Sequence, residues 1–126
     1  MRLLLDTHTL LWALTEKSKL SSRVELLLPS SETWFSVAGI WEIITKVQVG
    51  KLTLPRPTGE FVMSKLSSNG VQLLPITVDH VLRLESLPLH HRDPFDRILI
   101  AQSLEEKLPI VTSDPLFVRY PVDVIW

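Results

Sequence analysis

Short apolar segments alternate with segments of helical periodicity along the whole chain, and this alternation limits the possible folds. Residues 2–6 are typical of a buried strand, because they are short, apolar and end at a polar turn. Four more strands are predicted on similar grounds, at 33–36, 72–76, 109–113 and, at an edge, 122–126. Strands that alternate with helices form parallel sheets with both faces covered. The sequence therefore predicts an α/β fold, a three-layer α/β/α sandwich with a mostly parallel central sheet, as a single domain over 1–126.

Helix-capping and helix-breaking residues divide the segments between these strands. Thr7 is the expected cap of a helix over about 8–16. Ser36 is the expected cap of a helix that stops at Gly50. The remaining helices are predicted at 22–28 behind a capping box of Ser22 and Glu25, at about 59–68, from Thr77 to Pro88, and from Asp93-Pro94 to about Lys107.

Composition excludes several classes of protein. Of the 126 residues, 45% are hydrophobic and 21% charged, which is ordinary for a soluble domain with its own core. No apolar run reaches the ~18 residues of a membrane helix, and Asp6 interrupts the N-terminal leucines too early for a signal peptide. The lack of cysteine excludes disulfides and zinc–thiolate sites and fits a cytoplasmic protein. A net charge of −1 gives no global basic field for nucleic acids, although a local basic rim is compatible with it.

Four carboxylates fall where this fold would bring side chains together: Asp6, Glu42, Asp96 and Asp114. Asp6 and Asp114 directly follow predicted strands, whereas Glu42 and Asp96 lie early in predicted helices. In open α/β sheets the ligand site lies beyond the carboxyl ends of the strands. Carboxylates gathered there repel one another, and hard divalent cations with oxygen ligands neutralise them best. The pattern therefore predicts a Mg²⁺ site, with Mn²⁺ as the alternative ion.

Several of these acids also have an ordinary structural explanation. Asp6 and Asp114 have the sequence positions of helix-cap or turn residues. Glu42 is one helical turn before Lys46, so the two side chains have the spacing of a surface ion pair. Each acid alone is therefore weak support for a site, and the prediction depends on the set.

Residues 90–96 also allow both structural and functional explanations. Asp93 before Pro94 fits a helix cap, which explains it without any function. Asp96 is equally compatible with a role in the helix start and with a role in the site. His90 and His91 have side chains that can bind metal or contact phosphate, but adjacent histidines are more often found on a loop surface, which is the expectation here, and His8 is expected to cap or pack locally.

Other small α/β proteins with acids at strand ends fit less well. A phosphatase of the haloacid-dehalogenase type needs a second Asp two residues after the first, where this chain has His8. A phosphoacceptor receiver domain needs paired acids after the first strand and a lysine after the last. This chain offers Asp6-Thr7 and then ends at Trp126. No glycine-rich phosphate loop is present, which argues against a nucleotide cofactor.

Four segments, in order along nearly the whole chain, resemble PIN-domain proteins, and among them the VapC-type toxins of bacterial and archaeal toxin–antitoxin pairs. These segments are Leu4-Leu5-Asp6-Thr7-His8, Trp41-Glu42-Ile43 with Gly50-Lys51-Leu52 and Leu54-Pro55, His90-His91-Arg92-Asp93-Pro94-Phe95-Asp96-Arg97 with Ile100-Ala101-Gln102, and Thr112-Ser113-Asp114. The Asp-Pro-Phe-Asp-Arg block is the most specific of them. The chain departs from the family pattern at Gly39, where a small hydroxyl residue is common, and at Ser103, where alanine is frequent.

The resemblance implies a metal-dependent endoribonuclease. Its acidic quartet would be Asp6, Glu42, Asp96 and Asp114, of which Asp6 and Asp96 would bind the metal directly. Glu42 and Asp114 would complete the shell, partly through waters. The auxiliary residues would be Asp93, Thr7, Ser36 and Thr112.

The resemblance also implies partners. They are RNA, cleaved to a 5′-phosphate and a 3′-hydroxyl, a cognate antitoxin protein, and a second copy of the chain in a homodimer. Candidate phosphate contacts are Lys46, Lys51, Arg92 and Arg97. An antitoxin groove lined by Trp12, Trp34 and Trp41 is possible, but core packing is the expected role of at least two of them. The alternative is a catalytically silent PIN domain that only binds RNA or protein.

Overall fold

The computed structural model describes all residues from Met1 to Trp126. Its centre is a five-stranded sheet in the order β3-β2-β1-β4-β5, and every neighbouring pair is parallel. The strands are β1 (Arg2–Leu5), β2 (Glu32–Ser36), β3 (Gln72–Leu74), β4 (Ile110–Val111) and β5 (Val124–Ile125). The predicted α/β class and parallel sheet are confirmed, and the last strand lies at the edge, as predicted.

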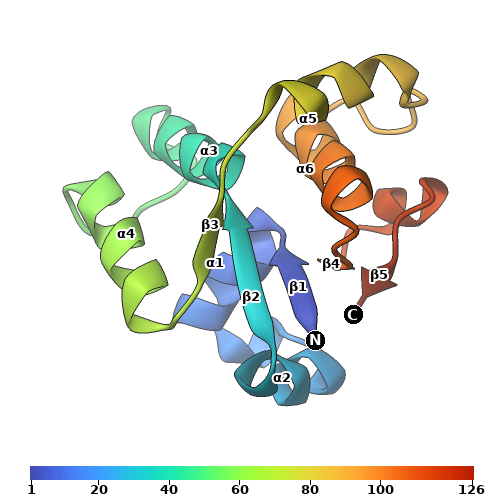
Figure 1. Ribbon diagram of the computed structural model, residues 1–126. Helices are drawn as coiled ribbons and strands as arrows, with labels where there is room; N and C mark the ends of the chain where they lie inside the picture. Colours follow the sequence, from blue (N-terminus) through green and yellow to red (C-terminus); the bar gives the residue numbers. More distant parts are fainter.

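Six α-helices connect these strands. They are α1 (Thr7–Thr15), α2 (Ser22–Leu27), α3 (Val37–Gln48), α4 (Thr58–Ser68), α5 (Val78–Arg83) and α6 (Pro94–Glu106). Short 3-10 turns follow at η1 (Lys17–Lys19), η2 (Leu28–Ser30), η3 (Leu84–Ser86) and η4 (Pro115–Arg119). Figure 1 shows α3 and α4 on one side of the strands and α5 and α6 on the other. None of the helices is long and apolar enough to cross a bilayer.

The alternation of side chains along β1 separates the two halves of the core. Leu3 and Leu5 are buried in a cluster that also contains residues of α1, α2, α3 and α4. Leu4, between them, points to the opposite face and contacts a cluster that includes Leu99 of α6. Successive strand residues face opposite sides of a sheet, so one apolar run serves both layers.

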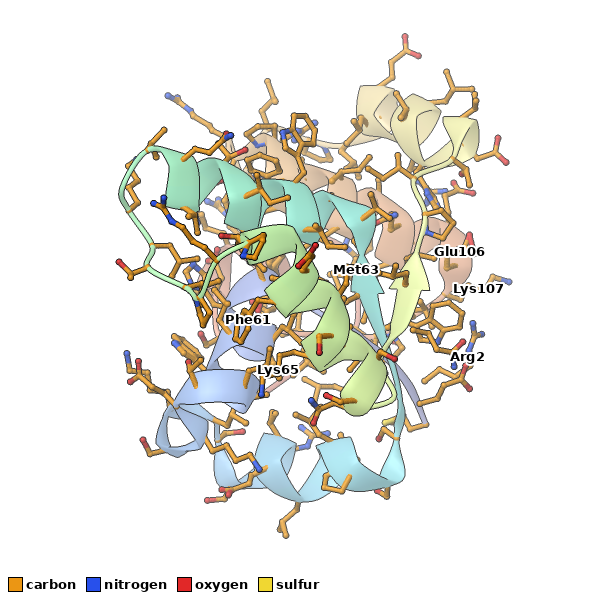
Figure 2. All side chains as sticks on the ribbon, turned by 90° about the vertical axis from the view of Figure 1, so that its left-hand side faces the viewer. Arg2, Phe61, Met63, Lys65, Glu106 and Lys107 are labelled. Carbon is orange, nitrogen blue, oxygen red and sulfur yellow. The ribbon has the colours of Figure 1, made fainter.

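Helix α4 forms part of the outer layer on the first face. Figure 2 views the molecule from this side and shows Phe61, Met63 and Lys65 on that helix. Val62 and Leu66 of the same helix are buried, and Lys65 Nζ lies 5.8 Å from the ring centre of Phe61. The stem of a lysine can cover an aromatic ring while its charge stays in water.

Two helix caps differ from the predicted ones by one residue. Asp6, not Thr7, caps α1, because its carboxylate accepts the Thr9 amide at 2.7 Å. Ser21, not Ser22, caps α2 and accepts the amide of Val24. In both cases two adjacent residues have side chains that can cap a helix. The first of the two accepts the backbone amide three residues later and is the cap.

Candidate metal centre

Asp6 follows β1, the strand from which the sheet is extended in both directions: toward β2 and β3 on one side and toward β4 and β5 on the other. β1 is flanked by β2 on one side and by β4 on the other, which makes this the position where open α/β folds bind ligands. One Asp6 oxygen accepts the Thr9 amide, and the other accepts a short hydrogen bond from the hydroxyl of Thr112. Thr9 Oγ1 in turn donates to the carbonyl of Val111 at 2.9 Å. The ends of β1 and β4 are therefore joined through a buried carboxylate.

Glu42 reaches the same region from the second turn of α3. Its side chain is only 3% exposed. Thr7 Oγ1 donates to one carboxylate oxygen at 2.7 Å, and Lys46 Nζ lies 2.6 Å from the other. The predicted pair with Lys46 exists, but it is not a surface pair, because the acid is buried. A buried carboxylate requires such partners, since desolvation otherwise makes its charge costly.

The first turn of α6 supplies Asp96. Asp93 caps this helix by accepting the amides of Phe95 and Asp96, so its predicted role as a helix cap is confirmed. Capping fixes the direction of the helix and leaves the Asp96 side chain free to point toward the sheet. One Asp96 oxygen lies 3.1 Å from Nε2 of His91.

Asp114 completes the set from the segment that follows β4. One of its oxygens accepts the amide of Leu116 at the start of η4, and the other lies 3.0 Å from Nε2 of His91. Its own amide donates to Thr112 Oγ1 at 3.1 Å. Asp114 is therefore both the predicted turn residue and a neighbour of Asp96.

The four acids Asp6, Glu42, Asp96 and Asp114, called here the carboxylate pocket, are linked through Asp96: its carboxyl is repelled by Asp6 and Glu42, and His91 joins it to Asp114. Desolvation, followed by repulsion from Asp93, Glu42 and Asp6, raises the pKa of Asp96 to about 7, although attraction to His91 opposes that rise. Burial also raises the pKa of Asp6, although its hydrogen bonds with Thr112 and Thr9 oppose that rise. Carboxylates repel one another this strongly only when they are close together. The negative charge of these acids is therefore not fully neutralised by neighbouring side chains of the protein.

The carboxylate pocket fits a divalent cation by the chemistry of its donors. All four acids offer hard oxygen atoms, and ligand atoms of His91, Asp96 and Asp114 lie within 4.8 Å of one another. Mg²⁺ and Mn²⁺ prefer carboxylate oxygen and water. Asp96 is the acid of the four that keeps one oxygen without a hydrogen-bond or ion-pair partner.

His91 is the site residue that the sequence analysis assigned wrongly. It was expected on a loop surface beside His90, yet it is 8% exposed and contacts both Asp96 and Asp114. His90 is exposed, as expected, and its ring packs against Tyr120. The signal that was available is the motif itself, since His91 directly precedes the Arg-Asp-Pro-Phe-Asp block.

The basic residues proposed as phosphate contacts differ in position. Arg97 is turned into the protein, where its guanidinium donates to the carbonyls of Leu84, Leu87, Pro88 and His91 and to the hydroxyl of Tyr120. Its N–H groups are used by the loop before α6, so this geometry does not support a phosphate contact. Lys46 is engaged with Glu42, whereas Lys51 and Arg92 are exposed.

Ser36 and the three tryptophans also have defined positions. Ser36 accepts the amide of Ala38 and caps α3, and none of its hydrogen bonds reaches a carboxylate of the pocket. Trp12 and Trp34 pack partly buried against the core clusters, which agrees with the expectation of core packing for two of the three. Trp41 is 62% exposed and packs edge-on against Phe95, with the ring centres 4.9 Å apart.

Comparison with models of protein families identifies the family of this chain. The model of the PIN domain matches residues 3–123. The chain belongs to the PIN-domain family. The match includes all four acids of the carboxylate pocket, and it confirms the family resemblance predicted from the motifs.

Solved structures of toxin–antitoxin complexes share the fold. A chain of VapBC2 from Rickettsia felis, bound to a DNA fragment from its promoter, superposes with a TM-score of 0.73 at 15% identity, covering 99% of this PIN domain and 98% of that chain. DNA-bound VapBC from Salmonella typhimurium gives 0.73 at 16% identity, with 99% and 97% covered. FitAcB from Neisseria gonorrhoeae gives 0.66 at 18% identity, with 100% and 97% covered. At these identities the likeness establishes the fold. A comparison with curated protein sequences finds no significant match.

Proposed function

We propose that this PIN domain is a Mg²⁺-dependent endoribonuclease of the VapC type, a toxin that a cognate antitoxin inhibits. The observation that carries the proposal is the carboxylate pocket, in which Asp96, whose pKa is raised to about 7, is grouped with three other acids from distant parts of the chain. Structural acids are normally neutralised by their own partners. Here mutual repulsion remains, and a bound cation would remove it.

Asp6 and Asp96 are the proposed direct ligands. Asp96 has a free oxygen, and each Asp6 oxygen keeps a second lone pair beyond its one hydrogen bond. Thr112 and the Thr9 amide hold the Asp6 carboxylate in one orientation, so little freedom would be lost when a ligand binds. When bound, the ion would supply positive charge for the scissile phosphate and lower the pKa of a coordinated water.

Glu42 and Asp114 are proposed to orient and deprotonate the attacking water. Thr7 and Lys46 fix the two oxygens of Glu42, and Leu116 fixes one oxygen of Asp114. A fixed carboxylate with lone pairs to spare is suited to accept a proton from a positioned water. Burial of Glu42 at 2% exposure keeps its orientation independent of bulk solvent.

The antitoxin partner is proposed from the structures that share the fold, which are VapBC and FitAB complexes. RNA is proposed as the substrate because of the resemblance of the motifs. Exposed Lys51 and Arg92 remain candidate phosphate contacts. The homodimer and the cytoplasmic location remain predictions of the sequence.

A cleavage assay tests the proposed reaction. Metal-free protein is incubated with several structured RNAs, then Mg²⁺ or Mn²⁺ is added, and the product ends are analysed for 5′-phosphate and 3′-hydroxyl groups. Asp6→Asn and Asp96→Asn should each lower the rate of RNA cleavage by more than about 100-fold, because each removes the charge of a proposed metal ligand. Asp123→Asn is the matched control, since it makes the same change at an exposed acid.

Two outcomes would count against this reaction: cleavage without metal, or site variants as active as the parent. Metal binding without cleavage of any RNA would favour the silent PIN domain instead. Expression in a bacterial host tests the toxin role separately. Growth arrest by the parent and not by Asp96→Asn would support it, and equal arrest by both would contradict it.

A further inference from the structure

His91 occupies the position between two acids of the carboxylate pocket, and the family motif alone gives it no role. Its Nε2 lies 3.0 Å from an Asp114 oxygen and 3.1 Å from an Asp96 oxygen. Neighbouring ligands of an octahedral ion with bonds of 2.0–2.1 Å are also about 3 Å apart. These distances alone therefore fit two arrangements: an imidazole that ligates the metal, or an N–H group that two carboxylates share.

The other ring nitrogen decides between these arrangements. The amide of Asp93 donates to His91 Nδ1 at 3.2 Å, so Nδ1 must present a lone pair. A neutral imidazole with a lone pair on Nδ1 carries its proton on Nε2, which faces Asp96 and Asp114. A histidine that ligates a metal through Nε2 has the opposite arrangement, with Nδ1–H donating to an acceptor. Here Nδ1 faces a donor, which is unsuitable for metal ligation.

The position of the ring is fixed from several sides. The His91 amide donates to the Tyr120 hydroxyl at 2.8 Å, and that hydroxyl donates to the carbonyl of Pro88 at 2.7 Å. Arg97 donates to the carbonyls of Pro88 and His91. The ring of Phe117 lies 5.8 Å from the imidazole. The loop that carries His91 is therefore held in one conformation beside the start of α6.

We propose that His91 is a positioning residue that donates its Nε2–H to both Asp96 and Asp114 and so holds the proposed metal ligand beside the acid proposed to orient the water, without ligating the metal itself. The inference rests on the proposed function, since it assigns a role to His91 in the proposed metal centre. One shared N–H reduces the repulsion between the acids and leaves the second Asp96 oxygen free. Asp96 and Asp114 then act as a pair, although 18 residues separate them in sequence.

Two variants separate the two nitrogens of the ring. In His91→Gln the amide nitrogen replaces Nε2, so donation to the carboxylates is kept. In His91→Asn the amide oxygen replaces Nδ1, so the Asp93 amide keeps its acceptor but the carboxylates lose their donor. Groups that orient metal ligands contribute about 10- to 100-fold to metal affinity. Mn²⁺ affinity, measured by calorimetry at pH 8, should fall by about that factor in His91→Asn and stay near the parent's value in His91→Gln.

Two spectroscopic measurements complete the test without any need for activity. Nitrogen NMR of the metal-free parent at pH 8 should place the His91 proton on Nε2. Pulsed EPR of the Mn²⁺-loaded parent, labelled with ¹⁵N-histidine, should show no directly coordinated imidazole nitrogen. A proton on Nδ1, a coordinated His91 nitrogen that His91→Gln abolishes, or parental Mn²⁺ affinity in His91→Asn would each overturn the proposal. If the parent bound no Mn²⁺, the proposed metal centre would fail, while the NMR measurement would still decide the hydrogen bonds of His91.

Discussion

At the scale of single residues, the protonation of Asp96 depends strongly on its surroundings. Burial and three neighbouring acids raise its pKa from 3.8 to about 7. The folded chain therefore binds a proton more tightly at this position than the unfolded chain does. By linkage, this contribution to stability is complete below pH 4 and is lost as the pH rises from about 4 to about 7. Asp6 contributes in the same direction, because burial raises its pKa too.

Asp96→Asn should therefore stabilise the metal-free protein at pH 8, because an uncharged amide replaces a repelled carboxylate. The expected gain in unfolding free energy is about 1–2 kcal/mol, less than the full linkage value because the side chain is partly exposed. Urea unfolding in the presence of a chelator measures it. The difference between variant and parent should widen from pH 5 to pH 8, and a constant difference would contradict the pKa assignment. Asp123→Asn should show no such widening.

At the scale of elements, the first turn of α3 packs very closely against the end of β2. A Cβ atom at Gly39 would lie within 2.8 Å of three ring atoms of Phe35, whose side chain is fully buried. The departure from the family pattern at Gly39 is thus matched by a large aromatic side chain four residues earlier. This contact helps to fix the direction of α3 and, with it, the position of Glu42 in its second turn.

Gly39→Ala should destabilise the protein by about 1–3 kcal/mol, the usual cost of overfilling a core. Gly59→Ala in the first turn of α4 is the matched control, because its Cβ would meet nothing within 4 Å and alanine favours helix. Denaturant unfolding compares the two. Adding Phe35→Leu to Gly39→Ala should recover part of the loss, and failure to do so would point to a backbone effect instead.

The conformation of the loop between α5 and α6 depends on the side chain of Arg97. The guanidinium donates to four carbonyls and one hydroxyl around this loop, a geometry that lysine cannot reproduce. Arg97→Lys should cost about 2 kcal/mol and speed proteolysis within residues 84–91. Arg92→Lys, at an exposed position, should change stability by less than about 0.5 kcal/mol. Equal effects of the two changes would contradict the assigned role of Arg97.

At the scale of the whole molecule, the carboxylate pocket joins segments from both ends of the chain. Asp6 follows the first strand, and Thr112, which donates to it, follows the fourth. An ion bound in the pocket would therefore hold β1, α3, α6 and the segment after β4 together. Ligands that bind only the folded state stabilise it by mass action.

Mg²⁺ or Mn²⁺ at a hundredfold excess over its dissociation constant should therefore raise the unfolding free energy by about 2.7 kcal/mol at pH 8. The effect at the same metal concentration should shrink below pH 7, because protons compete for Asp96 as its carboxyl is protonated there. Thermal unfolding at pH 6 and pH 8, with and without metal, measures both effects. Asp96→Asn should show little stabilisation by metal, and an effect as large as the parent's would exclude Asp96 as a ligand.

The amino-acid sequence alone determined the order of strands and helices and the parallel α/β class, and it predicted the four acids of the proposed metal centre. These features depend on local patterns, since apolar runs, caps and breakers act within a few residues of one another. It also predicted that Asp93 caps α6 and that Glu42 pairs with Lys46, because both contacts span at most four residues. The motifs, taken together, identified the family.

Only the tertiary structure decided which partners those residues have across the chain. His91 is buried between two acids, although it was expected on a loop surface, and Arg97 turns toward carbonyls, although it was a candidate phosphate contact. The physical reason is that each contact depends on the direction of α6 and the path of the loop before it. Neither is encoded in the few residues around the side chain. Burial then imposes the requirement for partners, and the fold determines which groups are close enough to meet it.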